Sequence, residues 1–120
     1  MDEGVCSSYG IDGGRLSRAR ARALPTEVES DLAGWFGALA HPARVRILHA
    51  LRDGELCVCE LADLVGLSIS ATSRQLASLR ARGAVDYRTE GRFSHYRLAD
   101  PALGGVLDLA LARVNGEGWP

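Results

Sequence analysis

Three cysteines carry the most distinctive chemistry in this chain of 120 residues. Cys57 and Cys59 are separated by one residue, and Cys6 lies near the start of the chain. On a regular helix, residues i and i+2 point about 200° apart, so two such thiols cannot meet on one ion. On an extended segment they face the same side, about 6.5 Å apart at Cα. The pair therefore chelates well only if the start of the helix that follows it opens or bends.

The candidate metal ligands are Cys6, Cys57 and Cys59. Two thiolates leave a trigonal or tetrahedral ion undercoordinated, and Cys6 is the only other thiol in the chain. All-sulfur ligation selects thiophilic ions, and three thiolates suit Pb(II), Cd(II), Hg(II) or As(III). His41 or a water is a candidate fourth ligand, although His41, beside Pro42, is expected to cap the second helix instead. The alternative is that Cys57 and Cys59 are small core hydrophobes and that Cys6 is incidental.

A second set of residues has the chemistry to read DNA. The helix predicted over residues 68–82 turns Thr72, Leu76 and Leu79 inward. Its opposite face can enter a major groove, where arginine and amide side chains make bidentate base contacts. The candidates on this helix are Ser70, Ser73, Arg74 and Gln75. The candidates for backbone or minor-groove phosphates on the hairpin that follows are Arg88, Arg92 and His95. The alternative is an ordinary solvated face, with His95 a plain surface residue.

Hydrophobic periodicity predicts the elements that must position these residues. Helices are expected over residues 26–40, 42–53, 58–65 and 68–82, and a last one follows Asp100. Leu61, Leu64 and Val65 are expected to be buried, as are Val45, Leu48 and Leu51. Strands 85–90 and 93–98, joined at Gly91-Arg92, predict a β-hairpin directly after a helix-turn-helix, which is a wing.

The predicted fold class is mainly α with a β-hairpin, a homodimeric winged helix-turn-helix. Residues 1–25 are expected to be an N-terminal arm, with either a short basic helix over residues 16–24 or a frayed tail. Residues 26–115 form the winged helix-turn-helix domain, and residues 116–120 a loose tail. The first long helix and the last one carry more apolar surface than a small domain can bury, so a second copy of the chain is expected to cover it. Dimerisation would place two recognition helices about one DNA turn apart.

Composition limits the class of protein. The formal net charge is −1, so any nucleic-acid contact must rest on local positive charge, which here is all arginine. No apolar run reaches the length of a membrane span, and the first residues do not form a secretory signal, so a cytoplasmic protein is expected. No base stands next to a nucleophile, and there is no C-x-x-C or glycine-rich phosphate loop, so we do not expect an enzyme.

The segment Glu55-Leu-Cys-Val-Cys-Glu-Leu61 resembles the thiolate metal box of the ArsR/SmtB family of metal-sensing repressors. The resemblance extends over about residues 30–112, through Ala38-Leu-Ala-His-Pro-Ala-Arg-Val-Arg-Ile47 before the box and Ser73-Arg-Gln-Leu-Ala-Ser-Leu-Arg80 after it. It implies a winged-helix homodimer that represses a resistance or efflux operon and leaves double-stranded operator DNA when metal binds.

The arm with Cys6 resembles the cadmium- and lead-responsive, CadC-like branch, in which arm cysteines of one subunit join the box of the other. Gly10 stands where that branch has a second arm cysteine, and Ala62 where the arsenic branch has a third box cysteine. The resemblance thus implies a site of three thiolates. Ala102 and Arg113 stand where many relatives have zinc-binding histidines on the last helix, so that site is expected to be absent. Relatives with this box include mercury sensors, which keeps Hg(II) open.

Two functions remain as hypotheses for this fold. The first is a repressor released from DNA by a thiophilic metal. The second is a thiol redox or persulfide sensor that uses Cys6 with Cys57 or Cys59. A disulfide between residues i and i+2 would close a strained small ring, which favours the first hypothesis.

Overall fold

The computed structural model describes residues 13–116 of the chain, so Cys6 lies outside the described residues. The chain divides into two compact units, residues 1–33 and 34–120. The first unit contains helix α2 (Gly13–Ala21) and the start of helix α3 (Thr26–Leu39). The basic helix predicted over residues 16–24 is present as α2 and begins three residues earlier. The N–H of Glu29 donates to the carbonyl of Pro25, so Pro25 precedes the first turn of α3 and Thr26 lies within it, not before it.

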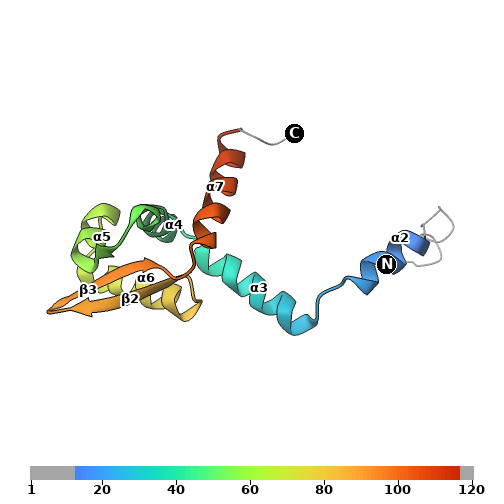
Figure 1. Cartoon of the computed structure of the whole chain (residues 1–120), viewed down its shortest axis with the longest axis horizontal. Helices are drawn as coiled ribbons and strands as arrows, with labels where there is room; N and C mark the ends of the chain where they lie inside the picture. Colours follow the sequence, from blue (N-terminus) through green and yellow to red (C-terminus); the bar gives the residue numbers. More distant parts are fainter. Residues whose placement is uncertain (1–12, 117–120) are drawn as a thin grey trace. The chain divides into compact units, whose positions relative to one another are not determined.

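The second unit is a helix-turn-helix followed by a wing (Figure 1). Its elements in order are the end of α3, α4 (Pro42–Ala50), a 3-10 turn η1 (Leu51–Asp53), β1 (Leu56–Cys57), α5 (Val58–Val65), α6 (Ile69–Ala81), β2 (Val85–Glu90), β3 (Phe93–Leu98) and α7 (Ala102–Val114). The predicted fold class is confirmed. No helix between residues 13 and 116 is long and apolar enough to cross a membrane.

The core lies between α4, α5, α6 and the base of the hairpin. Its fully buried members are apolar side chains from all four elements: Ile47, Leu48, Leu61, Leu76, Leu79 and Val85. Thr72 is the buried polar residue of this described core, and its hydroxyl donates to the carbonyl of Ser68 at 2.8 Å. That hydrogen bond offsets the cost of removing the hydroxyl from water.

Two residues expected in the core are not there. Val45 is 46% exposed, because α4 turns Ile47 and Leu48 inward, η1 continues the buried side with Leu51, and Val45 lies off that stripe. Leu64 is 45% exposed, because α5 packs through Leu61, with Val58 and Val65 on the same side at helical spacing. The predictions for Leu48, Leu51 and Leu61 are confirmed, and the error is limited to Val45 and Leu64, apolar residues at the edges of the buried stripes.

The turn between α5 and α6 is set by a glycine and a serine. Gly66 has φ 71°, a conformation that only glycine adopts at little cost, and it ends α5. Ser68 then caps α6, since its hydroxyl accepts the N–H of Ala71 at 3.0 Å. These two residues fix the angle at which the predicted recognition helix leaves α5.

The wing is a three-stranded antiparallel sheet with the order β1-β3-β2. Strands β2 and β3 have the predicted bounds and turn at Gly91, where φ is 62°. Strand β1 was not predicted, because two residues are too short to show an alternating pattern. It pairs Leu56 with Tyr96 and Cys57 with His95, so the cysteine pair begins on the sheet.

Candidate metal box and nucleic-acid interface

The helix that follows the cysteine pair begins between its two members. Cys57 is the last residue of β1 and precedes α5, with φ −83° and ψ 166°, which is extended backbone. Cys59 is the second residue of α5. The pair is therefore not on a regular helix, and the separation of about 200° that keeps i and i+2 thiols apart does not apply. Both cysteines are free; Cys57 is half-buried and Cys59 is exposed.

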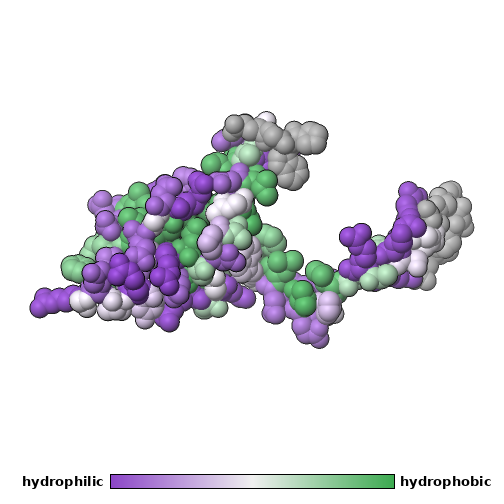
Figure 2. Space-filling view, in the orientation of Figure 1, coloured by the Kyte–Doolittle hydropathy of each residue, from purple (hydrophilic) through white to green (hydrophobic). Residues whose placement is uncertain are grey.

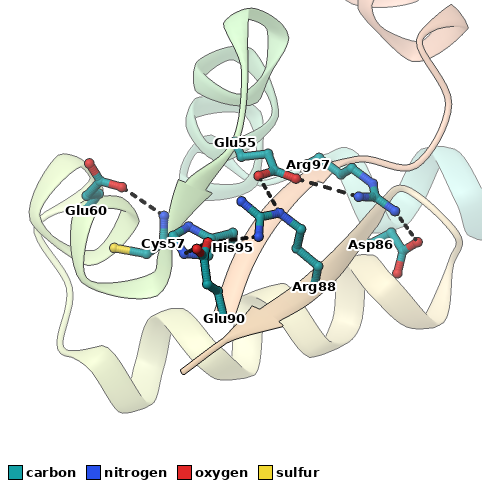
Figure 3. A network of polar contacts seen from close by, with 8 residues as sticks. All are labelled: Glu55, Cys57, Glu60, Asp86, Arg88, Glu90, His95 and Arg97. Carbon is teal, nitrogen blue, oxygen red and sulfur yellow. Dashed lines mark hydrogen bonds and ion pairs between the residues drawn. The ribbon is translucent and has the colours of Figure 1, made fainter. Parts of the chain in front are cut away.

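Glu60 holds the start of α5 against the sheet. Its Oε1 accepts the backbone N–H of Cys57 at 2.9 Å (Figure 3). This bond, then the thiol of Cys57 and more weakly the charge of His95, lowers the pKa of Glu60 below its ordinary value. A carboxylate at the third helical position caps an N-terminus by accepting an otherwise unpaired N–H and by favouring the helix dipole.

A row of paired residues crosses the sheet from the cysteine pair to the wing. Cys57 pairs with His95 on β3, and His95 pairs with Arg88 on β2. Within residues 13–116, no three or more cysteine, histidine or acidic residues come together as a metal-binding group. The described part of the chain therefore supplies two thiols, and it does not bring His41 or His95 to them as part of such a group.

Ion pairs connect the segment before β1 to both wing strands. Glu55 accepts Arg88 Nε at 2.8 Å and lies 3.6 Å from Arg97 Nη1. Arg88 also donates to Glu90 at 2.9 Å, and Arg97 lies 3.4 Å from Asp86 (Figure 3). These residues are largely exposed, so each pair adds little to stability; their importance is that they link Glu55, two residues before Cys57, to β2 and β3. Sequence reasoning missed this link, because Arg88 lies 33 positions from Glu55.

The exposed face of α6 is the one that the sequence predicts. Thr72, Leu76 and Leu79 are buried, and Ser70, Ser73 and Arg74 are exposed on the other side. The Arg74 side chain has no hydrogen bond or ion pair with any residue of the described part of the chain, and the same holds for the side chain of Arg92 in the hairpin turn. Both guanidinium groups are therefore available to an external acceptor.

Gln75 is placed differently from the other three candidates on α6. It is half-buried, and its Oε1 accepts Arg44 Nε at 2.6 Å. Arg44 also donates to the carbonyl of Ala38 at 2.8 Å. Because arginine carries only donors, the amide oxygen must face Arg44, which leaves the NH₂ of Gln75 and one lone pair of its oxygen for another partner. A bidentate contact to adenine needs the amide oxygen as well as the NH₂, so it would share that oxygen with Arg44.

The hairpin candidates also differ among themselves. Arg92 lies in the turn, whereas Arg88 is held by Glu55 and Glu90. His95 is half-buried, with Nε2 3.8 Å from a carboxylate oxygen of Glu90. Arg80 of α6 lies 4.5 Å from the ring centre of Tyr87, a cation–π contact that connects the predicted recognition helix to the wing. Sequence reasoning missed this contact because it joins residues on different elements.

Comparison with known proteins gives a consistent family. Residues 41–87 match the model described as "Bacterial regulatory protein, arsR family". The chain is 40% identical over 86 residues to a protein named transcriptional repressor SmtB homolog from Synechocystis, a match that covers 72% of this chain and 65% of that protein. It is 34% identical over 111 residues to a CadC homolog from Staphylococcus aureus, named a cadmium resistance transcriptional regulatory protein, covering 92% of this chain and 91% of that one.

The fold agrees with a solved relative. The homodimeric winged helix-turn-helix DNA-binding domain of Mb0332 from Mycobacterium bovis superposes with a TM-score of 0.70 at 26% identity, over 78% of this chain and 90% of that one. The family match lies on α4 to β2, the helix-turn-helix and the first wing strand, and includes Cys57 and Cys59. The chain belongs to the ArsR family of bacterial regulatory proteins.

Proposed function

We propose that this chain is a transcriptional repressor that binds operator DNA as a homodimer and leaves it when a thiophilic metal binds Cys6, Cys57 and Cys59. The observation that carries the proposal is the position of Cys57. It ends β1, precedes the first turn of α5 and pairs with His95 of the wing. A ligand bound there acts at the point where the wing and the helix-turn-helix meet.

The metal chemistry follows from the donors. Cys57 and Cys59 are free thiols, and an ion on both of them is reached from solvent through the exposed Cys59. Two sulfurs leave the ion undercoordinated, so Cys6 supplies the third. Sulfur ligands select soft ions, and Pb(II), Cd(II), Hg(II) and As(III) are the candidate inducers. The cadmium-resistance name of the Staphylococcus aureus relative supports this class of ion.

The route from metal to DNA has two branches. One runs along β1, because moving Cys57 disturbs its pairing with His95 and the Glu55 ion pairs to Arg88 and Arg97. The other runs through α5, which packs against α6 with Leu61 fully buried. Metal capture that turns Cys57 also competes with the hydrogen bond that Glu60 accepts from its N–H. Both branches end on elements of the DNA-reading surface.

On DNA, α6 enters the major groove with Ser70, Ser73 and Arg74, and Gln75 offers its NH₂ from the edge of that face. Arg92 at the hairpin turn reaches the phosphate backbone, and Arg88 and His95 lie further back on the wing. Small serines allow close approach of the helix, and the guanidinium groups of Arg74 and Arg92 supply charge and bidentate geometry.

The experiment uses the full chain. Metal-free protein first selects a duplex from a random library, and that duplex then reports binding by fluorescence anisotropy. Adding Cd(II) or Pb(II) should produce a thiolate-to-metal absorption band and reduce duplex affinity by at least tenfold, which corresponds to about 1.4 kcal/mol of coupling. Cys57→Ser should bind the duplex normally but lose both the band and the release.

The control separates the metal function from alternatives. In the Cys57→Ser background, Ser78→Cys adds a thiol on α6 away from the cysteine pair. This double variant should still lack the metal absorption band and the metal-induced release from DNA. If no soft metal changes the affinity of the wild-type protein, the metal-sensing proposal is wrong. If release instead follows reversible oxidation without metal, the redox hypothesis replaces it.

A further inference from the structure

Helix α2 and the residue that follows it concentrate positive charge in a short segment. Arg15, Arg18, Arg20 and Arg22 fall within eight residues, and residues 13–26 contain no acidic side chain. Every residue of α2 is exposed, and none is buried. Figure 2 shows the hydrophilic surface of this helix. None of the candidate DNA contacts on α6 and the hairpin comes from this segment.

The spacing places the charges close together. Arg18 and Arg22 are separated by four residues, so they lie on one side of the segment, one helical turn apart. Like charges at this spacing repel and destabilise an isolated helix. Helix α2 has only nine residues, fewer than the ~12–15 that an isolated helix needs to be stable in water, and it buries none of them. A polyanion bound along this side would remove the repulsion and stabilise the helix.

We infer that α2 is a second DNA-binding element, which contacts phosphates that flank the operator and carries no base specificity. DNA is favoured over other polyanions because the same chain carries the helix-turn-helix and wing. Arginine donates bidentately to phosphate, and an arginine-rich helix adds affinity that depends on salt but not on sequence. The inference rests on the proposed function, since it requires that the chain bind DNA.

The alternative occupant is an acidic surface of a second copy of the chain. The acidic residues nearest in sequence are Asp12, directly before α2, and Glu27, which lies in the first turn of α3, where the helix dipole already favours it. Phosphates every few ångströms along a duplex match a row of arginines better than two carboxylates do. The salt dependence of duplex binding distinguishes the two occupants, because only contact with DNA releases its counterions.

The test compares two double variants of the full chain. Arg18 and Arg22 are replaced by Gln in one and by Lys in the other. Gln and Lys have helix propensities close to that of Arg, so neither variant changes the intrinsic tendency of this segment to form a helix. We call the sequence selected from the library the core site. Affinity is measured by anisotropy at several salt concentrations, on a duplex in which the core site is extended by about one helical turn on each side.

The slope of log affinity against log salt changes by about 0.9 for each phosphate that the protein no longer neutralises. The Gln variant should therefore have a slope shallower by about 2 if one arginine of each arm contacts a phosphate, and by about 4 if both do. The Lys variant should keep most of the wild-type slope. Shortening the duplex to the core site should weaken binding by the wild type and leave the Gln variant unchanged.

Two outcomes would overturn the inference. An unchanged slope in the Gln variant, with normal operator binding, means that α2 does not touch DNA, and the proposed function still stands. A Gln variant that no longer dimerises in sedimentation, at unchanged slope, identifies a second copy of the chain as the occupant. A wild-type protein that selects no duplex at all refutes the proposed function itself, so the two failures are distinct.

Discussion

At the scale of single residues, the wing arginines are not equivalent. Arg88 is held by Glu55 and Glu90 at 2.8 and 2.9 Å, whereas the side chains of Arg92 and Arg74 have no partner in residues 13–116. A guanidinium has five N–H groups, and Glu55 and Glu90 occupy two of those of Arg88. An external acceptor can reach the remaining donors only from the side that these two carboxylates do not cover. Arg88 is thus better suited to orienting the wing than to searching for a phosphate.

The ion pair makes a prediction for Glu90. Its pKa lies below the ordinary 4.5 because Glu90 accepts a hydrogen bond from Arg88, and because the charges of Arg88 and His95 favour the carboxylate. Arg88→Met should raise the pKa of Glu90 toward its ordinary value, measured by carbon-detected NMR titration. Arg97→Met is the matched control, since Arg97 contacts Glu55 and Asp86 but not Glu90, and it should leave the Glu90 pKa unchanged.

The sign of the linked effect on stability follows. A carboxylate whose pKa is lower in the folded state stabilises the fold above its unfolded pKa, and that contribution disappears as the pH falls through the folded value. The difference in urea midpoint between wild type and Arg88→Met should therefore shrink on going from pH 6 to below the lowered pKa. A difference that grows in acid would contradict the assignment.

At the scale of elements, α5 is the component that joins the metal box to the predicted recognition helix. It is eight residues long and is held at one end by the Glu60 hydrogen bond and at the other by Gly66. Only Leu61 and Ala62 are buried in it. So short a helix depends on tertiary packing for its stability. A displacement of Cys57, directly before its first turn, therefore affects a large part of the helix.

Two leucines of α5 test that packing. Leu61 is fully buried and Leu64 is 45% exposed. Leu61→Ala should lower the free energy of unfolding by about 2–5 kcal/mol, because it removes methylenes and leaves a cavity. Leu64→Ala should cost about 1 kcal/mol or less. Urea unfolding at one fixed protein concentration measures both changes. Equal losses of unfolding free energy would show that Leu64 is buried like Leu61, as hydrophobic periodicity predicts.

At the scale of the whole molecule, the last helix presents apolar surface that the described fold leaves uncovered. Leu109 is 64% exposed and Val114 is 83% exposed, with Val106 and Leu111 also largely exposed. Figure 2 shows hydrophobic side chains gathered on α7. Contiguous apolar surface of this kind usually marks an interface with another protein. A second copy of the chain is the occupant that the homodimeric relative supports.

Leu109→Glu should therefore prevent a second copy of the chain from docking on α7, because it places a charge in the apolar contact without disturbing the core of its own chain. Analytical ultracentrifugation measures the change, and affinity for the selected duplex should fall with it. Leu64→Glu is the control, since Leu64 is similarly accessible but lies on α5; that variant should remain a dimer. A Leu109→Glu protein that still sediments as a dimer would place the interface elsewhere.

Local signals in the sequence were sufficient to predict the order and type of the main elements and the bounds of the hairpin, because amphipathic periods, Gly66, Ser68 and Gly91 act over a few residues. They also identified the thiols that are candidate metal ligands and the face of α6 that is the candidate DNA contact. Contacts between distant segments became visible only in the folded chain. The pairing of Cys57 with His95, the Glu55 ion pairs and the Arg44 contact to Gln75 join residues 31 or more positions apart, which no local pattern encodes. The packed sheet alone shows that the metal box begins on the wing, since a two-residue strand is recognised by its partner and not by its own sequence.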